Sequence, residues 1–202
     1  MDITWQGNTC FVCKGKDSTV VINPDLQAGK VRGQIVLSSL KKEDTVDVEY
    51  MTQLCDWPGE YEVGGVPIVA FQAWKTSKKS EEEGGKKADS TLIFRFDLDG
   101  IKICHLGELG HSLTSDMVKE IGDTDILMMN AGKGTNLESK KAVEILEAID
   151  PRMLIIGTGE GKKELMKELG ADQVEEMESF SFKSRNDLPE SKRGYIVLSK
   201  TE

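Results

Sequence analysis

Short apolar runs separated by turn residues fill the first half of the chain, and helical patterns enter only in the second half. Gly7-Asn8 and Gly15-Lys16-Asp17 separate the first three runs, which predicts a β-meander. Gly64-Gly65 and Asp99-Gly100 are strong signals for two further hairpins. Because helices then alternate with apolar runs, the order indicates an α/β (α+β) fold, with mixed β-sheets that carry helices on their outer faces.

Three helices are expected in the second half of the chain. Thr114 or Ser115 can cap a short helix that runs through Ile121. Residues 137–149 form the strongest amphipathic pattern, and a third helix is expected over residues 162–169. The apolar runs predict strands at residues 3–6, 9–14, 19–22, 35–38, 61–63, 66–73, 91–96, 102–104, 125–129, 153–156, 173–177, 179–183 and 195–198.

Length and composition indicate a single globular domain over residues 1–202. Hydrophobic residues make up 38% of the chain and charged residues 30%, which is typical of an ordered domain. No apolar run approaches the ~20 residues that a membrane span needs, and the first residues do not resemble a secretory signal. The four cysteines lie mostly in apolar runs, as in a reduced protein. We therefore expect a cytoplasmic protein that has no membrane partner.

The charge of the chain argues against a nucleic-acid partner. The formal net charge is −9 at pH 7. A surface that binds nucleic acid is basic, because it must neutralise phosphates. We expect no nucleic acid to bind.

Residues 75–89 (KTSKKSEEEGGKKAD) are rich in Lys, Glu, Ser and Gly. Such a segment cannot bury enough apolar surface to hold a fixed position. It predicts a mobile loop or a long hairpin tip. A lid over a binding site is the functional alternative, which composition alone supports weakly.

Cys10 and Cys13 have the C-x-x-C spacing found in some metal sites. In a strand, however, these two side chains point to opposite faces. A zinc knuckle would also need a loop glycine and a second cysteine pair. We interpret both residues as core cysteines.

The turn at residues 157–162 (GTGEGK) follows an apolar run and precedes a predicted helix. Backbone amides at such a position can bind an anion. The spacing is not that of a phosphate-binding P-loop, and Glu160 would repel a phosphate. A plain turn is favoured, with anion or nucleotide binding as a weaker alternative.

The chain has two histidines, His105 and His111, and Glu108 lies between them. Two imidazoles and a carboxylate could bind a metal. One histidine ends a predicted strand and the other follows a turn, so the spacing does not ensure that they converge. A nucleophilic triad is not indicated either, because the chain has no G-x-S-x-G motif. On this stretch alone, a strand, a turn and two surface histidines are the favoured interpretation.

Five runs, taken together and in order, resemble the metallo-β-lactamase fold, and specifically its small bacterial and archaeal branch of Zn-dependent hydrolases. The runs are residues 3–11 (ITWQGNTCF), 20–24 (VVINP), 58–66 (PGEYEVGGV), 103–110 (ICHLGELG) and 125–128 (DILM), the last followed by Gly132. The resemblance implies a four-layer αββα sandwich built from two mixed β-sheets. It covers most of the chain, roughly residues 1–160.

This family binds two metal ions through a His-x-His-x-Asp-His motif after a strand. The corresponding positions of this chain are Leu40, Lys42, Asp44 and Thr45. Of these ligand positions, only Asp44 keeps the family residue. Glu108 stands where the family has its bridging Asp. No histidine occurs near Trp74 or Lys75, nor at residues 157–159, where the family has further ligands. Asn8 and Asn23 stand at two further motif positions, where the family has Asn or His and Asp respectively.

These departures imply a degenerate metal site. Zinc in such sites needs imidazole or thiolate donors, which Asp44 and Glu108 cannot supply. Lys42 would also place an ammonium where a dication should bind. It could instead form an ion pair with Asp44 or Glu108. The position of His105 belongs to the branch motif but not to the usual ligands, so a supporting or packing role is expected.

Two functions are compatible with this pattern. The first is a non-catalytic binding or scaffold protein that holds no cofactor, uses the former cleft or an outer face, and could form a homodimer. The second is a hydrolase with a residual or relocated site around Asp44, His105, Glu108 and His111. We expect the first, because activating water near neutral pH needs a Lewis acid that these residues hold poorly.

Overall fold

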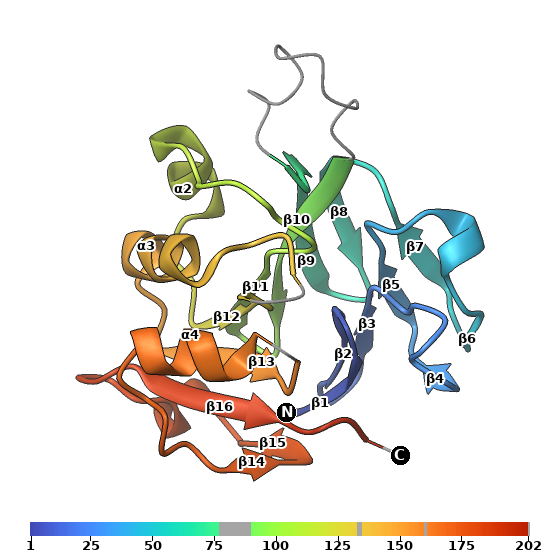
Figure 1. Ribbon diagram of the computed structural model, residues 1–202. Coiled ribbons are helices and arrows are strands. Elements are labelled where there is room, and N and C mark those ends of the chain that lie inside the picture. The colour runs from blue at the N-terminus through green and yellow to red at the C-terminus, as the bar shows by residue number, and fades with distance from the viewer. Residues whose placement is uncertain (77–89, 133–134, 160, 202) are drawn as a thin grey trace, which may run out of the picture.

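The computed structural model describes residues 1–76, 90–132, 135–159 and 161–201. Most of the loop predicted at residues 75–89 lies outside these residues. Two large β-sheets form the centre of the molecule (Figure 1). The layered α/β architecture that the sequence predicts is confirmed. Among the described residues, no helix is long and apolar enough to cross a membrane.

The first sheet has six strands in the order β15-β1-β2-β3-β5-β7. These strands are β1 (Asp2–Gly7), β2 (Cys10–Lys14), β3 (Thr19–Ile22), β5 (Ile35–Leu37), β7 (Gln53–Cys55) and β15 (Ser179–Ser181). Strands β1, β2 and β3 are antiparallel neighbours, so the predicted meander is confirmed. Strand β15 pairs antiparallel with β1 and closes the other side of the meander.

The second sheet has eight strands in the order β14-β16-β13-β12-β11-β10-β9-β8. They are β8 (Gly59–Val63), β9 (Val66–Trp74), β10 (Ser90–Leu98), β11 (Ile101–His105), β12 (Ile126–Met128), β13 (Met153–Gly157), β14 (Glu176–Met177) and β16 (Gly194–Leu198). The two central residues of each predicted hairpin turn, Gly64-Gly65 and Asp99-Gly100, have positive φ. Such turns match the twist of the strands that they join.

The described residues of the second half form three α-helices: α2 (Ser115–Ile121), α3 (Ser139–Ile149) and α4 (Lys162–Glu168). The Thr114 hydroxyl accepts from the Met117 backbone N–H and caps α2. All three helices lie on the outer side of the second sheet (Figure 1). Helix α3 begins two residues later than the amphipathic pattern predicts, although Leu137 is already buried.

The outer face of the first sheet is covered by short elements. They are the 3₁₀ turn η1 (Lys42–Asp44) and the paired strands β4 (Val31–Arg32) and β6 (Val48–Glu49). A second 3₁₀ turn, η2 (Arg185–Asp187), lies near the C-terminus. These pieces span only two or three residues each, which is too short to show a hydrophobic period. The sequence therefore did not predict them.

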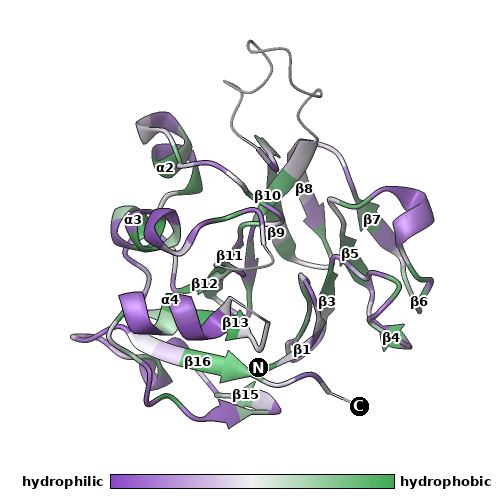
Figure 2. Ribbon diagram, viewed as in Figure 1, coloured by the Kyte–Doolittle hydropathy of each residue, from purple (hydrophilic) through white to green (hydrophobic). Residues whose placement is uncertain are grey.

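The main hydrophobic core lies between the two sheets. Phe11, Phe94 and Phe96 are among its fully buried side chains. A second cluster lies between the second sheet and the helices, and a small third cluster lies under β4 and β6. Figure 2 shows the central strands in hydrophobic colours and the helices with mixed faces. Because the sheet interiors are apolar, polar side chains gather where the strands end.

Candidate functional site

A cavity of about 380 Å³ lies where loops from both sheets meet. Its lining comes from the loops that follow β1, β3, β5, β9, β11 and β12. The lining residues are Asn8, Thr9, Asp25, Leu40, Asp44, Lys75, Gly107, Glu108, Leu109, Asn130, Thr135 and Asn136. Two of the residues predicted from the sequence, Asp44 and Glu108, are therefore brought to one cavity, which we call the cleft.

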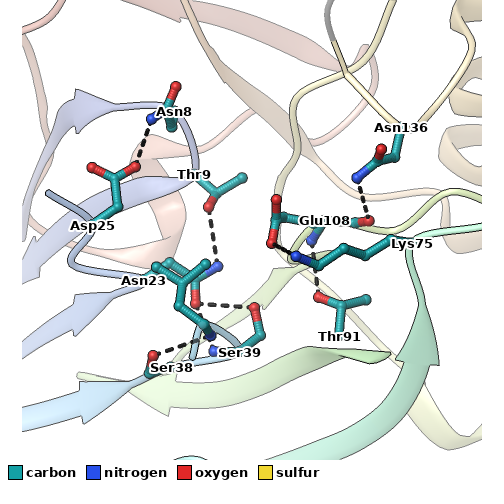
Figure 3. Close-up of polar contacts among 11 residues, drawn as sticks. Asn8, Thr9, Asn23, Asp25, Ser38, Ser39, Lys75, Thr91, Glu108 and Asn136 are labelled. Atoms are coloured by element: carbon teal, nitrogen blue, oxygen red, sulfur yellow. Dashed lines mark hydrogen bonds and ion pairs between the residues drawn. The ribbon is translucent and has the colours of Figure 1, made fainter. Parts of the chain in front are cut away.

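An ion pair between Lys75 and Glu108 lies in the cleft. Lys75 Nζ is 2.6 Å from Glu108 Oε2, and both side chains are about three-quarters buried. Figure 3 shows the two side chains pointing toward each other. The Glu108 carboxylate therefore already has a cation at contact distance.

Two glycines bring the Lys75 and Glu108 backbones close together. The Gly110 N–H donates to the Trp74 carbonyl at 3.0 Å, and a Cβ on Gly110 would lie only 1.7 Å from the Lys75 carbonyl oxygen. Gly107 has φ +59, and a Cβ there would lie 2.4 Å from the Leu92 carbonyl oxygen. Side chains larger than hydrogen are excluded at both positions, so the glycines permit the contact between the loop and the strand ends.

Asn23 connects three loops beneath the cleft. Its side chain is fully buried, and its Nδ2 donates to Thr9 Oγ1 at 3.1 Å. Its Oδ1 accepts from both the backbone N–H and the hydroxyl of Ser39, at 2.8 and 3.1 Å. Because these partners come from the β1–β2 and β5–β6 connections, one neutral amide fixes the loops that carry the cleft.

Asn8 forms the opposite rim of the cleft. Its Nδ2 donates to Asp25 Oδ2 at 2.7 Å. Its carbonyl oxygen accepts from Trp5 Nε1 at 2.8 Å and from the Asn130 side-chain amide. Asn8 has a positive φ of 43°, a conformation that Asn tolerates better than most residues. Figure 3 shows this group apart from the Lys75–Glu108 pair.

His105 is buried and does not line the cleft, so the expectation of a surface histidine was wrong at this position. The Gly107 N–H donates to His105 Nδ1 at 3.0 Å, and the ring meets Phe11 edge-on at 5.6 Å. Burial lowers the pKa of His105 from 6.5 to about 3, although a hydrogen bond with the Thr9 backbone acts in the opposite direction. The ring is therefore neutral at physiological pH, and it connects strand β11 to the β1–β2 turn.

His111 also lies outside the cleft. Its Nε2 is 3.4 Å from the Trp74 backbone N–H, and its Nδ1 is 2.8 Å from the Ser112 carbonyl. These distances fit a ring that carries its proton on Nδ1 and accepts on Nε2. The ring centroid is 5.9 Å from that of Trp74. Neither histidine therefore lines the cleft that Asp44 and Glu108 share.

The positions that correspond to the family's His-x-His-x-Asp-His motif do not all face the cleft. Asp44 lines the cleft. Lys42 and Thr45 line another, more apolar cavity of about 260 Å³, and Leu40 lies in the walls of both cavities. Within the described residues, Lys42 forms no ion pair with Asp44 or Glu108. The sequence suggested an ion pair between Lys42 and Asp44 or Glu108, and this suggestion was wrong. Glu108 pairs with Lys75 instead.

The donors in the cleft do not fit zinc. In the part of the chain that the structure describes, no three His, Cys, Asp or Glu side chains group closely enough to hold a metal ion. The carboxylates of the cleft would have to act without imidazole or thiolate, the donors that zinc prefers. The four cysteines are buried and unpaired by disulfides, and none of them lines the cleft.

A further cavity of about 290 Å³, which we call the second cavity, adjoins the cleft. The two cavities share Leu40 and Lys75. Its rim carries Trp57, whose side chain is 73% exposed. Sequence reasoning did not select Trp57, Asn130 or Asn136 as site residues. Asn130 could have been found, because it follows a buried strand at the edge where such sites form.

Comparison with known protein families identifies the superfamily to which this cleft belongs. A family model described as a beta-lactamase superfamily domain matches residues 2–156. The chain belongs to this family. The resemblance found in the sequence is thereby confirmed, and the fold is that of the metallo-β-lactamase superfamily.

Two solved structures share the fold of this chain, and a curated relative is similar to most of its sequence. A proposed Zn-dependent hydrolase of the metallo-β-lactamase superfamily from Thermotoga maritima is 25% identical, with a TM-score of 0.79 and 98% of each chain covered. The metallo-β-lactamase fold protein YhfI from Bacillus subtilis is 10% identical, with a TM-score of 0.61, 98% of this chain and 96% of YhfI covered. A metal-dependent hydrolase from Archaeoglobus fulgidus is 20% identical, with 77% of this chain and 81% of the relative covered.

Proposed function

We propose that this superfamily member has lost the dinuclear zinc site and binds a ligand or partner in the cleft without hydrolysing it. The observation that carries this proposal is the ion pair between Lys75 and Glu108 at 2.6 Å. By the family resemblance, Glu108 occupies the position of the bridging metal ligand. A lysine ammonium against that carboxylate supplies the positive charge that a metal would otherwise supply.

Electrostatics supports the proposal. A dication placed near Glu108 would lie close to the Lys75 ammonium and would be repelled by it. Moving Lys75 away would break a contact between two side chains that are each about three-quarters buried. The remaining carboxylate ligand, Asp44, cannot replace the missing imidazoles.

The cleft itself supports a binding role. The amides of Asn8 and Asn23 fix its loops through hydrogen bonds of 2.7 to 3.1 Å. A cavity that is held open by its own side chains is prepared for a ligand at low entropic cost. Loss of metal chemistry therefore need not remove binding.

The alternative is a hydrolase with a residual or relocated site. Two observations favour it: the relatives from Thermotoga maritima and Archaeoglobus fulgidus carry hydrolase names, and Asp44 and Glu108 line one cavity. His105 and His111 are the donors that such a site would need to recruit. Each would have to leave its present contacts with Gly107 or Trp74.

Metal content separates the two functions. The purified protein is incubated with zinc, freed of excess ions by gel filtration and measured by elemental analysis. We expect far less than one equivalent of zinc, and no hydrolysis of chromogenic ester, phosphodiester or β-lactam substrates in zinc or manganese. A Glu108→Gln variant treated in parallel is the matched control for adventitious metal. One or two equivalents in the original protein, absent from that variant, would overturn the proposal.

A further inference from the structure

We propose that the cleft and its neighbouring cavity form one groove that binds a short neutral saccharide; this inference rests on the proposed non-catalytic binding function. The two cavities, of about 380 and 290 Å³, share Leu40 and Lys75 in their walls. One cavity reaches Asn136 and the other reaches Trp57. Together they suit an elongated ligand better than a single compact one.

The groove wall is rich in neutral polar side chains. Amide groups come from Asn8, Asn130 and Asn136 in the cleft and from Gln72 in the second cavity. An amide side chain presents both donors and an acceptor, and a sugar hydroxyl can act as either. Asn136 uses its Nδ2 to donate to the Glu108 carbonyl at 3.3 Å. Within the described residues its Oδ1 has no protein donor, so it can accept from a ligand hydroxyl.

Hydroxyl side chains extend the same pattern. They are Thr9 and Thr135 in the cleft, and Ser39, Ser90 and Thr91 in the second cavity. Ligand pockets for drug-like molecules are mostly apolar, with only a few polar groups. The wall of this groove is somewhat more polar than apolar, which favours a ligand whose surface is covered with hydroxyl groups.

Charges of both signs line the groove, so neither an anion nor a cation meets a uniform field. Asp25 and Asp44 in the cleft and Asp56 in the second cavity would repel a phosphate or carboxylate ligand. Lys41 adds a positive charge in the second cavity. The ion pair between Lys75 and Glu108 leaves no net charge where the two cavities join. The aspartates can still accept hydrogen bonds from ligand hydroxyls.

Trp57 supplies a flat apolar surface at one end of the groove. It lies in the turn between β7 and β8, and the Tyr61 hydroxyl donates to its carbonyl oxygen at 2.8 Å. Its side chain is 73% exposed although it is one of the largest apolar groups in the chain. A rigid aromatic face buries large area at low entropic cost, and it can pack against the C–H face of a sugar ring.

Saturation-transfer NMR and calorimetry test the inference with maltotriose, cellotriose, xylotriose and the trimer of N-acetylglucosamine. We expect at least one trisaccharide to bind and Trp57→Ala to weaken its affinity by about tenfold or more. Asn136→Ala should weaken binding as well. Tyr50→Ala is the matched control, because Tyr50 is also 73% exposed but lines neither cavity, and it should leave affinity unchanged.

Three outcomes would overturn the inference. They are no binding of any trisaccharide, equal loss in Trp57→Ala and Tyr50→Ala, or binding of spermine or inorganic phosphate in place of the sugars. Elemental analysis of the same samples keeps this test separate from that of the proposed function. Metal-free protein that binds no saccharide contradicts this inference alone. Stoichiometric zinc contradicts the proposed function whatever the sugars do.

Discussion

Lys75 Nζ lies 2.6 Å from Glu108 Oε2, and the two residues reach this contact from the ends of β9 and β11. These strands are not hydrogen-bonded neighbours, because β10 lies between them. The contact depends on the loop after β11 folding back over the end of β9, where Gly110 donates to Trp74. The ion pair therefore depends on how these loops pack against each other as well as on the attraction between the two charges.

Replacing Lys75 with Met should destabilise the protein by roughly 1–2 kcal/mol, between the values for exposed and buried pairs. The reason is that Glu108 would keep a partly buried carboxylate without a cation. The measurement is urea unfolding at neutral pH. Adding Glu108→Gln should recover part of the loss, and Lys41→Met serves as the control. A Lys75→Met protein that is as stable as the original protein would contradict a structural role for the pair.

Replacing Gly110 with Ala should be far more damaging. The new Cβ would lie 1.7 Å from the Lys75 carbonyl oxygen, so the backbone must move, at a cost of about 3 kcal/mol or more. Gly159→Ala is the control, because a Cβ at Gly159 meets nothing within 4 Å. Thermal unfolding of both variants checks the prediction. Equal melting temperatures would show that the loop is less tightly packed than described.

Stability should fall as the pH drops below 6.5. Burial lowers the pKa of His105 from 6.5 to about 3, so the unfolded chain binds a proton in this range and the folded chain does not. The His105 contribution is complete above pH 6.5 and is lost toward pH 3, by up to about 1.4 kcal/mol per pH unit.

His105→Gln should flatten this part of the pH profile, which urea unfolding at a series of pH values would measure. NMR of the imidazole C–H signals gives a direct check on the original protein. A titration of His105 near pH 6.5 would contradict its burial as a neutral ring.

The thiols should be unreactive until the protein unfolds. All four cysteines are buried, and burial raises the pKa of Cys55 to about 11 and that of Cys104 to about 12. Because the thiolate is the reactive form, DTNB at pH 8 should label almost nothing in the native state. All four thiols should react in guanidinium chloride. Rapid native labelling of one thiol would reveal a local opening.

Turn chemistry made much of the fold predictable from the sequence. Gly64-Gly65 and Asp99-Gly100 adopt the positive φ angles that two-residue hairpin turns require. Helix α2 begins where the Thr114 capping signal places it. Such signals are local, so a single sequence contains them. The short strands β4 and β6 have no comparable local signal.

The cleft was only partly predictable, because its contacts join residues far apart in the chain. Family motifs identified Asp44 and Glu108, which both line the cleft. Charge type alone could not decide between Lys42 and Lys75 as the partner of Glu108. That choice depends on the close approach of Gly110 to Lys75, which is a property of the packed loops.

The pairing of β1 with β15 has a consequence for biosynthesis. The register joins Asp2 to Ser181 and Thr4 to Ser179, so β1 must wait for its partner until more than 170 further residues have been synthesised. Until then its free edge can pair with strands of other nascent chains. Slow translation of the intervening residues should therefore lengthen chaperone association, and the first sheet should be completed only after β15 has left the ribosome.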